Sequence, residues 1–572
     1  MELLYKHIIK DFFSKKTLIG ILSLLFVFIA FMYYFVHFSI DKNLVLFNEM
    51  QAAEGLLSDN KEKYYIALQN NYILIRNITL AMVGVISLIL FFLIRNVMNK
   101  SQVKIGHLQT LGFLLTDVVN VYVLIIIGLS FSCSLIGLCL GYFGSNYLIM
   151  ANKQTYLVDS ILKGINFKSF MIGTIFVTVF LGIITYIAGI SVKKSDVALM
   201  LKHITKADIR LGIIERLIQK LPIRNKFRFK LTMKNISAIA LLIVAIVTFN
   251  IMFILSVSLI FSGNKIINSQ TTGRHYLYDI SYNCYNNDAS AYDDEAIPYI
   301  KYEVDIEIAH KTVKYNIVGI DKLSELFELV DNKGRQIAIS DGIILNPELK
   351  ENYGVKIGDI IYINIEGNKY KVRVAAIAEN AALKTVYLSK KQVAEMIQQD
   401  NNSFNGILTN QLLKDGDELV SIDEEISAIE KSLTSNKASA IINQSIGVIT
   451  GCLLIYLAIF IGLTNSMNSI LIFDLLGYRR HEINKILLNP YIIVSNLLFL
   501  FTFPISAYVA KKIQIMTSIA TNDYMPFKIN IVTFIYMLII LNILCLGVRA
   551  LFTKKVKKVI SAEQQAEFLY EW

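Results

Sequence analysis

The stretch KIGHLQTLGFLLTDVV, residues 104–119, lies between two long apolar runs, and ILIFDLLGYRRHEINK, residues 470–485, lies between two others. The Leu-Gly pair at 111–112 matches the pair at 476–477, and an aromatic residue follows in both copies. Glycine at such a place permits a helix end or the close approach of a neighbouring segment. The three-residue phrase is weak evidence alone, but its presence at two equivalent places indicates an internal duplication.

The composition indicates an integral membrane protein. Of the 572 residues, 54% are hydrophobic and only 18% are charged, which is too apolar for a soluble enzyme of this length. The net charge is +11. In such a chain a basic excess orients loops toward the cytoplasm more often than it binds nucleic acid, so no nucleic-acid partner is expected.

Long apolar runs recur along the whole chain. A bilayer core requires roughly 20 apolar residues in a helix. The runs that meet this length are residues 17–40, 78–95, 121–149, 169–191, 237–262, 444–466, 488–510 and 529–551. The sequence therefore predicts a polytopic α-helical membrane protein with eight transmembrane helices.

Lysine and arginine set the predicted topology. They gather before the first run, after the second and fourth, before the fifth, and after the sixth and eighth. By the positive-inside rule both termini are cytoplasmic, and residues 263–440 are extracellular. Abundant Ile, Lys and Asn with scarce Pro and Trp are typical of an AT-rich genome, which favours the cytoplasmic membrane of a low-GC bacterium.

The two matched phrases divide the chain into two four-helix repeats. The predicted segments are an interfacial elbow helix at 1–16, a first four-helix unit at 17–192 with a short outside loop at 41–77, a cytoplasmic linker and second elbow helix at 193–236, a fifth span at 237–262, an α+β extracellular domain at 263–440, spans six to eight at 441–552, and a cytoplasmic tail at 553–572.

Residues 263–440 change to short alternating strands, such as KTVKYNIVGI and KYKVRVAAIAE. A turn at Gly358-Asp359 and a helix capped by Ser389 are expected between them. The acidic residues at 288–295 lack the glycine and distal glutamate of a calcium loop. A solvated loop is therefore favoured over a metal site.

Apolar residues in the first phrase predict an amphipathic helix along the membrane face. Ile105, Leu108, Leu111 and Leu115 recur at steps of three and four residues. One interpretation is an interfacial linker with solvated charges. The other is a coupling helix that contacts a soluble motor, and two such helices suit a symmetric dimeric partner.

Both phrases resemble the coupling-helix segments of FtsX/MacB-type permeases of ABC transporters, and LLGYRRHEI in the second copy is the nearer match. The stretch GIILNPELKENYGVKIGDIIYI resembles the MacB-like periplasmic core domain, and peptide-resistance permeases of the BceB type share the short first loop. This resemblance implies two FtsX-like units. It also implies that the ATPase-coupling residues are Lys104, His107, Leu108, Leu111, Gly112 and Asp117 in the first copy, and Phe473, Leu476, Gly477, Arg479, Arg480 and Glu482 in the second.

The chain lacks the motifs of a catalyst. There is no G-x-x-x-x-G-K-[ST] phosphate loop, so ATP and Mg are expected to bind a separate cytoplasmic ABC ATPase, in two copies per permease. No catalytic, cofactor or metal residues are predicted in the chain itself. Ionisable residues are almost missing from the apolar runs; His37 is expected at the membrane interface, and Asn250 in an interhelical hydrogen bond.

Two functions remain open from the sequence. The first is a permease subunit that exports, extracts or releases an antimicrobial peptide, lipopeptide or lipid-linked molecule at the outer leaflet. The second is a transmembrane regulator that relays ATPase motion to a cell-wall hydrolase or a sensor kinase without transport. Membrane lipid is an expected contact in both.

Overall fold

The computed structural model describes residues 2–14, 16–54, 59–156, 158, 161–191, 235–287, 296–308, 311–321, 325–339, 342–411, 417–466, 472–473, 476–521 and 524–560. Two compact units form: a helical unit of Met1–Ile254, Asn443–Ala510 and Asn530–Trp572, and a β-rich unit of Leu255–Ile442 and Lys511–Ile529. Nearly all of the predicted linker and second elbow helix lies outside the described residues, as do the acidic loop and the end of the C-terminal tail.

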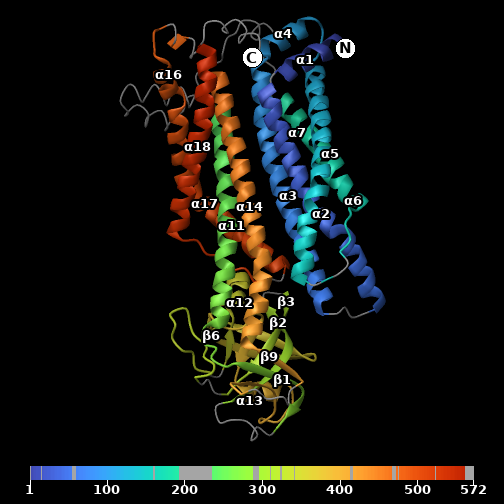
Figure 1. The fold of residues 1–572 in the computed structure, drawn as a ribbon, viewed down its shortest axis with the longest axis vertical. Helices are drawn as coiled ribbons and strands as arrows, with labels where there is room; N and C mark the ends of the chain where they lie inside the picture. The colour runs from blue at the N-terminus through green and yellow to red at the C-terminus, as the bar shows by residue number, and fades with distance from the viewer. Residues whose placement is uncertain are drawn as a thin grey trace. The chain divides into compact units, whose positions relative to one another are not determined.

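Within the described residues, eight helices are long and apolar enough to span a membrane, which is compatible with a polytopic membrane protein. Seven begin and end as single helices: α2 (Lys16–Glu54), α3 (Asp59–Lys100), α5 (Leu115–Tyr156), α11 (Ile236–Thr271), α14 (Ile422–Asn465), α17 (Asn489–Thr521) and α18 (Ile531–Ile560). The eighth joins α6 (Phe167–Phe170), the π-helical segment η1 (Met171–Phe176) and α7 (Val177–Ile190). Shorter helices are α1 (Glu2–Ser14), α4 (Gln102–Thr110) and α16 (Arg480–Leu487) (Figure 1).

Several helices continue beyond their apolar runs. The sequence predicted an outside loop at 41–77, whereas α2 reaches Glu54 and α3 begins at Asp59. These extensions pack on each other through buried Phe47, Tyr64 and Leu68. Their sequence is too polar for a membrane core, and this packing stabilises the helical conformation there. At the other end of the sixth apolar run, α14 begins at Ile422 and continues through the run as one helix.

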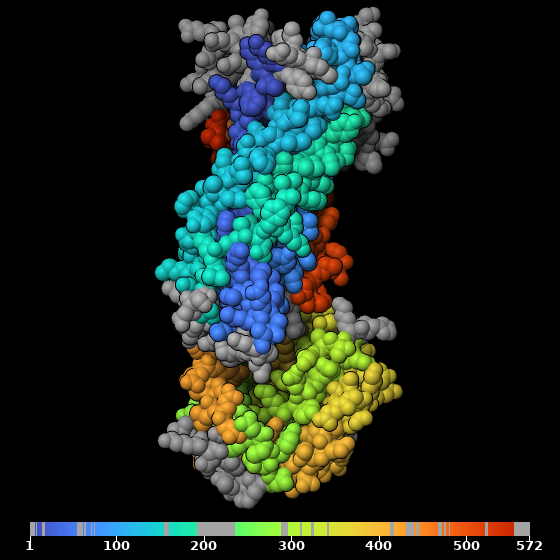
Figure 2. Space-filling model, turned by 90° about the vertical axis from the view of Figure 1, so that its right-hand side faces the viewer, coloured from blue at the N-terminus to red at the C-terminus, as the bar shows by residue number. Residues whose placement is uncertain are grey.

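Small residues bring α2 and α5 into direct contact. A Cβ atom added to Gly137 would lie 2.4 Å from the Cβ of Ala30, and one added to Gly141 would lie 2.6 Å from the Cβ of Tyr34. This G-x-x-x-G spacing is typical of close helix packing in membranes. Figure 2 shows α5 and α7 side by side on one face of the same unit.

The β-rich unit is built around a closed ring of strands. Its strands are β1 (Tyr278–Asn286), β2 (Ile297–Ile308), β3 (Lys311–Gly319), β4 (Ile343–Leu345), β5 (Ile360–Ile365), β6 (Asn368–Ile377), β7 (Thr385–Leu388), β8 (Phe404–Thr409) and β9 (Glu418–Ser421). The order β3-β7-β4-β6-β5-β2 closes because β2 also pairs with β3, and β8, β1 and β9 extend from β2. This ring, with α12 (Pro347–Tyr353) and α13 (Lys390–Met396), encloses a core that includes Ile306, Ile363 and Val374.

Local signals in this unit match their predictions. The Ser389 side chain accepts a hydrogen bond from the N–H of Gln392 at 3.4 Å and caps α13. Gly358 has a φ of 93°, and the Asp359 carboxylate accepts a hydrogen bond from the N–H of Lys356 at 2.8 Å. Both the predicted cap and the predicted turn are therefore confirmed.

Long helices contribute residues to both units. The boundary between the units falls within α11 at Ile254, within α14 at Ile442 and within α17 at Ala510. The backbone of each helix is continuous across its boundary residue. The chain therefore passes between the units within each of these three helices.

Candidate functional site: two Leu-Gly-aromatic turns

The first turn joins α4 to α5. Gly112 adopts a φ of 93°, a conformation that L side chains rarely take, and it ends α4. The N–H of Phe113 donates to the carbonyl oxygen of Leu108 at 3.2 Å, and the N–H of Gly112 donates to that of Gln109 at 3.0 Å. Bonds of this kind satisfy the last carbonyl groups of a helix.

The second turn repeats this arrangement. Gly477 has a φ of 81°, and the N–H of Tyr478 donates to the carbonyl oxygen of Phe473 at 3.0 Å. The described residues on its N-terminal side are 472–473 and 476, and the neighbouring residues 467–471 and 474–475 lie outside them. The two turns therefore share a left-handed glycine and the same hydrogen bond to a residue five positions back.

A carboxylate starts the helix after each turn. The Asp117 carboxylate accepts a hydrogen bond from the N–H of Leu114 at 2.9 Å, and the Glu482 carboxylate accepts one from the N–H of Arg479 at 3.0 Å. Each carboxylate also lies in the first turn of its helix, where negative charge is favourable. The sequence placed both residues among the ATPase contacts, and the structure adds this capping role within the chain.

Exposed apolar side chains surround both glycines. Leu111 is 74% exposed and Leu114 is 66% exposed, while Leu476 is 67% exposed in the position that matches Leu111. Arg479 is exposed in the position that matches Leu114. Apolar side chains displayed together on a helix end are typical of a surface that contacts another molecule.

The predicted amphipathic helix through Leu115 does not form as one helix. Ile105 and Leu115 are buried, but they belong to α4 and α5 respectively, and Leu111 between them is exposed. The left-handed glycine explains the break, because it stops the helix and turns the chain. The predicted apolar face is therefore divided into a buried part and an exposed part.

The other predicted coupling residues are distributed around the turns. Lys104 forms an ion pair with Asp11 of α1. His107 is exposed and Leu108 is half-buried. Phe473 is buried, and its ring lies edge-on to the ring of Tyr478 at 5.5 Å. Arg480 begins α16, and its side chain lies outside the described part of the chain.

Helix α1 supports the first turn. Besides the ion pair of Asp11 with Lys104, the buried ring of Phe12 lies edge-on to Tyr122 of α5 at 6.0 Å. Figure 1 shows α1 and α4 at one end of the helical unit, the end at which α16 also lies. The two turns therefore belong to the same end of this unit.

A buried polar cluster in α2 was missed from the sequence. His37, expected at the membrane interface, is 3% exposed, and its Nδ1 atom lies 2.7 Å from the carboxylate of Asp41. The second carboxylate oxygen of Asp41 accepts a hydrogen bond from the N–H of Asn166. The Asn43 side chain donates a hydrogen bond to the carbonyl oxygen of Leu162 and accepts one from its N–H. The spacing of His and Asp by one helical turn was the available signal.

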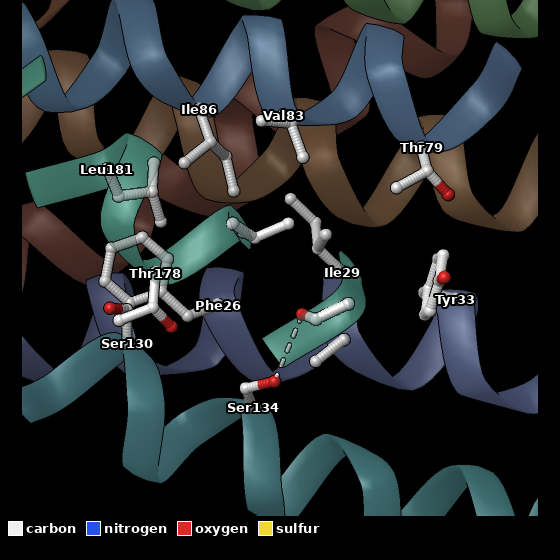
Figure 3. Close-up of a pocket in the computed structure, with 13 residues that line it drawn as sticks. Phe26, Ile29, Tyr33, Thr79, Val83, Ile86, Ser130, Ser134, Thr178 and Leu181 are labelled. Atoms are coloured by element: carbon white, nitrogen blue, oxygen red, sulfur yellow. Dashed lines mark hydrogen bonds between the residues drawn. The ribbon is translucent and has the colours of Figure 1, made fainter. Parts of the chain in front are cut away.

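A narrow hollow lies between α2, α3, α5 and α7 (Figure 3). Its lining includes Phe26, Ile29 and Leu181, and the hydroxyl of Ser134 at one side donates to the carbonyl oxygen of Gly173 at 3.3 Å. Gly173 belongs to η1, a π-helical turn of a kind found often at functional sites. None of the thirteen residues drawn around the hollow is charged.

Polar contacts fix α11 and α14 within the β-rich unit. The guanidinium of buried Arg274 donates to the side chain of Gln270 at 2.6 Å and to Glu425 of α14 at 3.2 Å. Lys265 of α11 forms ion pairs with Glu379 at 3.2 Å and Glu351 at 3.6 Å. Arg274 therefore links the end of α11 to the start of α14, and Lys265 links α11 to α12 and to the segment after β6.

The end of α17 and the segment after it are also part of the β-rich unit. Asn352 of α12 donates to the Ser518 hydroxyl at 3.0 Å, and the main-chain N–H of Lys528 donates to the hydroxyl of Ser258 at 3.2 Å. Tyr524 is buried, and this burial raises the pKa of its hydroxyl. The sequence did not predict that residues 511–529 would join this unit.

The described fold defines a class, namely a multi-pass helical architecture compatible with a membrane protein and a separate β-rich domain. No protein-family model matches the chain, and no curated protein matches it in sequence. The function must therefore be argued from the two turns and the helices that connect the units.

Proposed function

We propose that this protein is the membrane subunit of an ATP-binding-cassette complex of the FtsX/MacB type. The observation that carries the proposal is the repeated turn, with Gly112 and Gly477 in the same conformation and Leu111 and Leu476 exposed in the same position. A partner that binds one such turn would recognise the other in the same way. Two copies of a cytoplasmic ABC ATPase are the partner that this repetition favours.

In this proposal the two turns and both termini face the cytoplasm of a bacterial cell, and the β-rich unit is extracellular. The chain has two FtsX-like four-helix repeats, and its β-rich unit serves as a MacB-like core domain. ATP and Mg bind only to the partner. The free energy that drives the conformational change comes from differential binding of the partner to two states of the membrane subunit.

Motion would reach the β-rich unit through the long helices. Movement of the ATPase subunits displaces the turns and the helices that follow them. The continuous helices α11, α14 and α17 carry this displacement, because each contributes residues to both units. Within the β-rich unit, the ion pair of Arg274 with Glu425 links the end of α11 to α14, and the ion pair of Lys265 with Glu379 links α11 to the segment after β6.

The substrate in this proposal is an amphiphile at the outer leaflet, either an antimicrobial peptide, a lipopeptide or a lipid-linked molecule. The residues around the hollow in Figure 3 carry no charge, and they do not favour passage of a polar solute between these helices. Mechanical export, extraction or release by the β-rich unit agrees better with the connected helices. This action would give resistance to such a peptide.

Purification tests the proposal. The protein isolated from cells that carry its native operon should retain an ATP-hydrolysing partner, and the protein isolated alone should hydrolyse no ATP. Stimulation of the ATPase by an amphiphile would favour the permease over the regulator of a hydrolase or kinase. An active, stable complex that contains no nucleotide-binding partner would contradict the proposal.

A further inference from the structure

Strands β5 and β6 present a mixed basic and apolar surface on the outside of the strand ring. Ile360 lies opposite Arg373, and Tyr362 lies opposite Lys371. Residues that are directly opposite in an antiparallel pair project from the same side of a sheet. These four side chains, together with Ile357 in the preceding turn, are called the β5–β6 face.

The burial pattern shows that the β5–β6 face points away from the core. Along β5, Ile361 and Ile363 are buried, whereas Ile360 is 50% exposed and Tyr362 is 44% exposed. Ile357 is 64% exposed. Two large apolar side chains on one side of β5 and a third in the turn before it are therefore exposed, and exposed apolar side chains of this kind mark a binding surface.

The basic residues of this face lack the partners that their neighbours have. Lys369, two residues before Lys371 on β6, pairs with Glu307 at 2.7 Å. Lys314 on β3 pairs with Glu303 at 3.1 Å. Among the ion pairs formed by described residues, none includes Lys371 or Arg373. Asp305 and Glu307 of β2 lie on the same side of the sheet, opposite Asn364 and Tyr362, and Glu307 is already paired with Lys369. Lys371 and Arg373 are therefore the cations of this side that can bind an added anion.

Arg373 is positioned over the turn that begins β5. Its Nη2 atom lies 3.9 Å from the place of a Cβ atom on Gly358. The nearby Asp359 carboxylate accepts a hydrogen bond from the main-chain N–H of Lys356. The guanidinium therefore lies beside the turn that precedes the apolar residues of β5. The Asp359 carboxylate forms its hydrogen bond within that turn.

The location of the strands excludes one mode of recognition. β5 pairs with β2 and β6, and β6 pairs with β4 and β5, so neither is an edge strand. A peptide cannot add to them as a new strand, and a ligand must be bound by side chains. A standard protein–protein interface uses roughly 20–30 residues on each partner. The face has only five side chains, which suits a small ligand better than a protein.

We propose that the β5–β6 face binds an alkyl phosphate. Lys371 and Arg373 bind the phosphate group, and the apolar side chains of the face contact the first carbon atoms of the alkyl group. A phosphate monoester carries a charge of about −1.5 to −2 near neutral pH and suits two adjacent cations, and arginine can bind it through two hydrogen bonds. As a substrate assignment this rests on the proposed function, for which it selects an anionic lipid-linked molecule over a cationic peptide. The binding itself requires no ATPase.

The test uses the full-length protein in nanodiscs of zwitterionic lipid, titrated with dodecyl phosphate, with empty nanodiscs as the blank. The variant Lys371→Gln with Arg373→Gln should weaken binding by about tenfold or more, as expected for lost charge-assisted hydrogen bonds. Tyr362→Ser should weaken it less. Lys314→Gln, on β3 outside the face, is the matched control and should bind like the unmodified protein.

Each other outcome would overturn the inference. Equal affinity of the double variant and the unmodified protein would show that these cations do not bind the ligand. Equal affinity for ethyl phosphate would remove the role of the apolar side chains, and binding to anionic vesicles without binding to dodecyl phosphate would indicate a bilayer-docking surface. Because no ATPase is present, failure here is separate from failure to find an ATP-hydrolysing partner.

Discussion

Gly112 and Gly477 adopt the same left-handed backbone conformation, with φ angles of 93° and 81°, at matching positions of the repeated phrase. Gly112 ends α4, and in both turns the residue after the glycine bonds to a carbonyl group five positions back. Since side chains other than glycine rarely adopt this conformation, the repeated glycine is a requirement of the backbone.

Alanine at either glycine should therefore destabilise its turn. We expect Gly112→Ala and Gly477→Ala each to cost roughly 1–2 kcal/mol of local stability, because alanine is strained in the left-handed region. Hydrogen exchange of the amides around each turn measures this change. Gly128→Ala is the control, because a Cβ there meets nothing within 4 Å and its φ is not positive; equal protection in all three variants would contradict the prediction.

The capping carboxylates should matter for the helices that follow. Asp117→Ala and Glu482→Ala remove the acceptors for the N–H groups of Leu114 and Arg479. The expected loss is about 0.5–2 kcal/mol at each helix start, seen as faster exchange of those amides. Thr116→Ala, exposed in the same turn as Asp117, should leave exchange unchanged. If it had the same effect as Asp117→Ala, the capping role would be wrong.

The turns differ in charge at the position that follows the aromatic residue. Leu114 and Arg479 occupy it, and both are exposed. We expect Arg479→Ala to reduce ATPase association and substrate-stimulated turnover more than Leu114→Ala, since the guanidinium can form a charge-assisted contact that leucine cannot. Both variants must be compared at equal abundance in the membrane. Normal association of the arginine variant would leave Arg479 only a role in orienting the chain across the membrane.

Asp279 provides a pH test within the β-rich unit. Burial raises the pKa of this carboxyl group, which accepts a hydrogen bond from the Tyr299 hydroxyl at 2.6 Å. A raised pKa in the folded state means that folding favours the protonated form. The contribution of Asp279 to the free energy of unfolding is therefore complete below the unfolded-state pKa of about 4, and it is lost as the pH rises from there to the folded-state pKa. Asp279→Asn keeps an acceptor for Tyr299 and should flatten that part of the stability curve. Identical curves for both proteins in thermal melts would contradict the sign.

The sequence was sufficient for features that depend on short stretches of chain. Each of the eight apolar runs corresponds to a helix that can span a membrane, because run length alone determines that property. Asn250 makes its predicted interhelical bond, to the Thr502 hydroxyl at 3.2 Å. The turn at Gly358 and the cap at Ser389 follow equally from local chemistry.

Features that depend on distant contacts were not predictable. The burial of His37 requires the segment around Asn166, more than a hundred residues away, to bond Asp41. The strand ring closes only because β2 pairs with both β3 and β5. At the candidate site the repeated glycines were identified from the sequence, but the exposure of Leu111 and the capping by Asp117 were not, since both depend on where α4 ends and α5 begins.

The number of ATPase subunits bound per chain tests the central claim most directly. Native mass spectrometry of the complex should give two nucleotide-binding subunits for the unmodified protein. It should give one for Leu111→Asp, one for Leu476→Asp and none when both are changed, because each exposed leucine belongs to one turn. Leu277→Asp, an exposed leucine of the β-rich unit, should retain both subunits. A complex that keeps two ATPase subunits when both turns are altered, or that never contains any, would contradict the account.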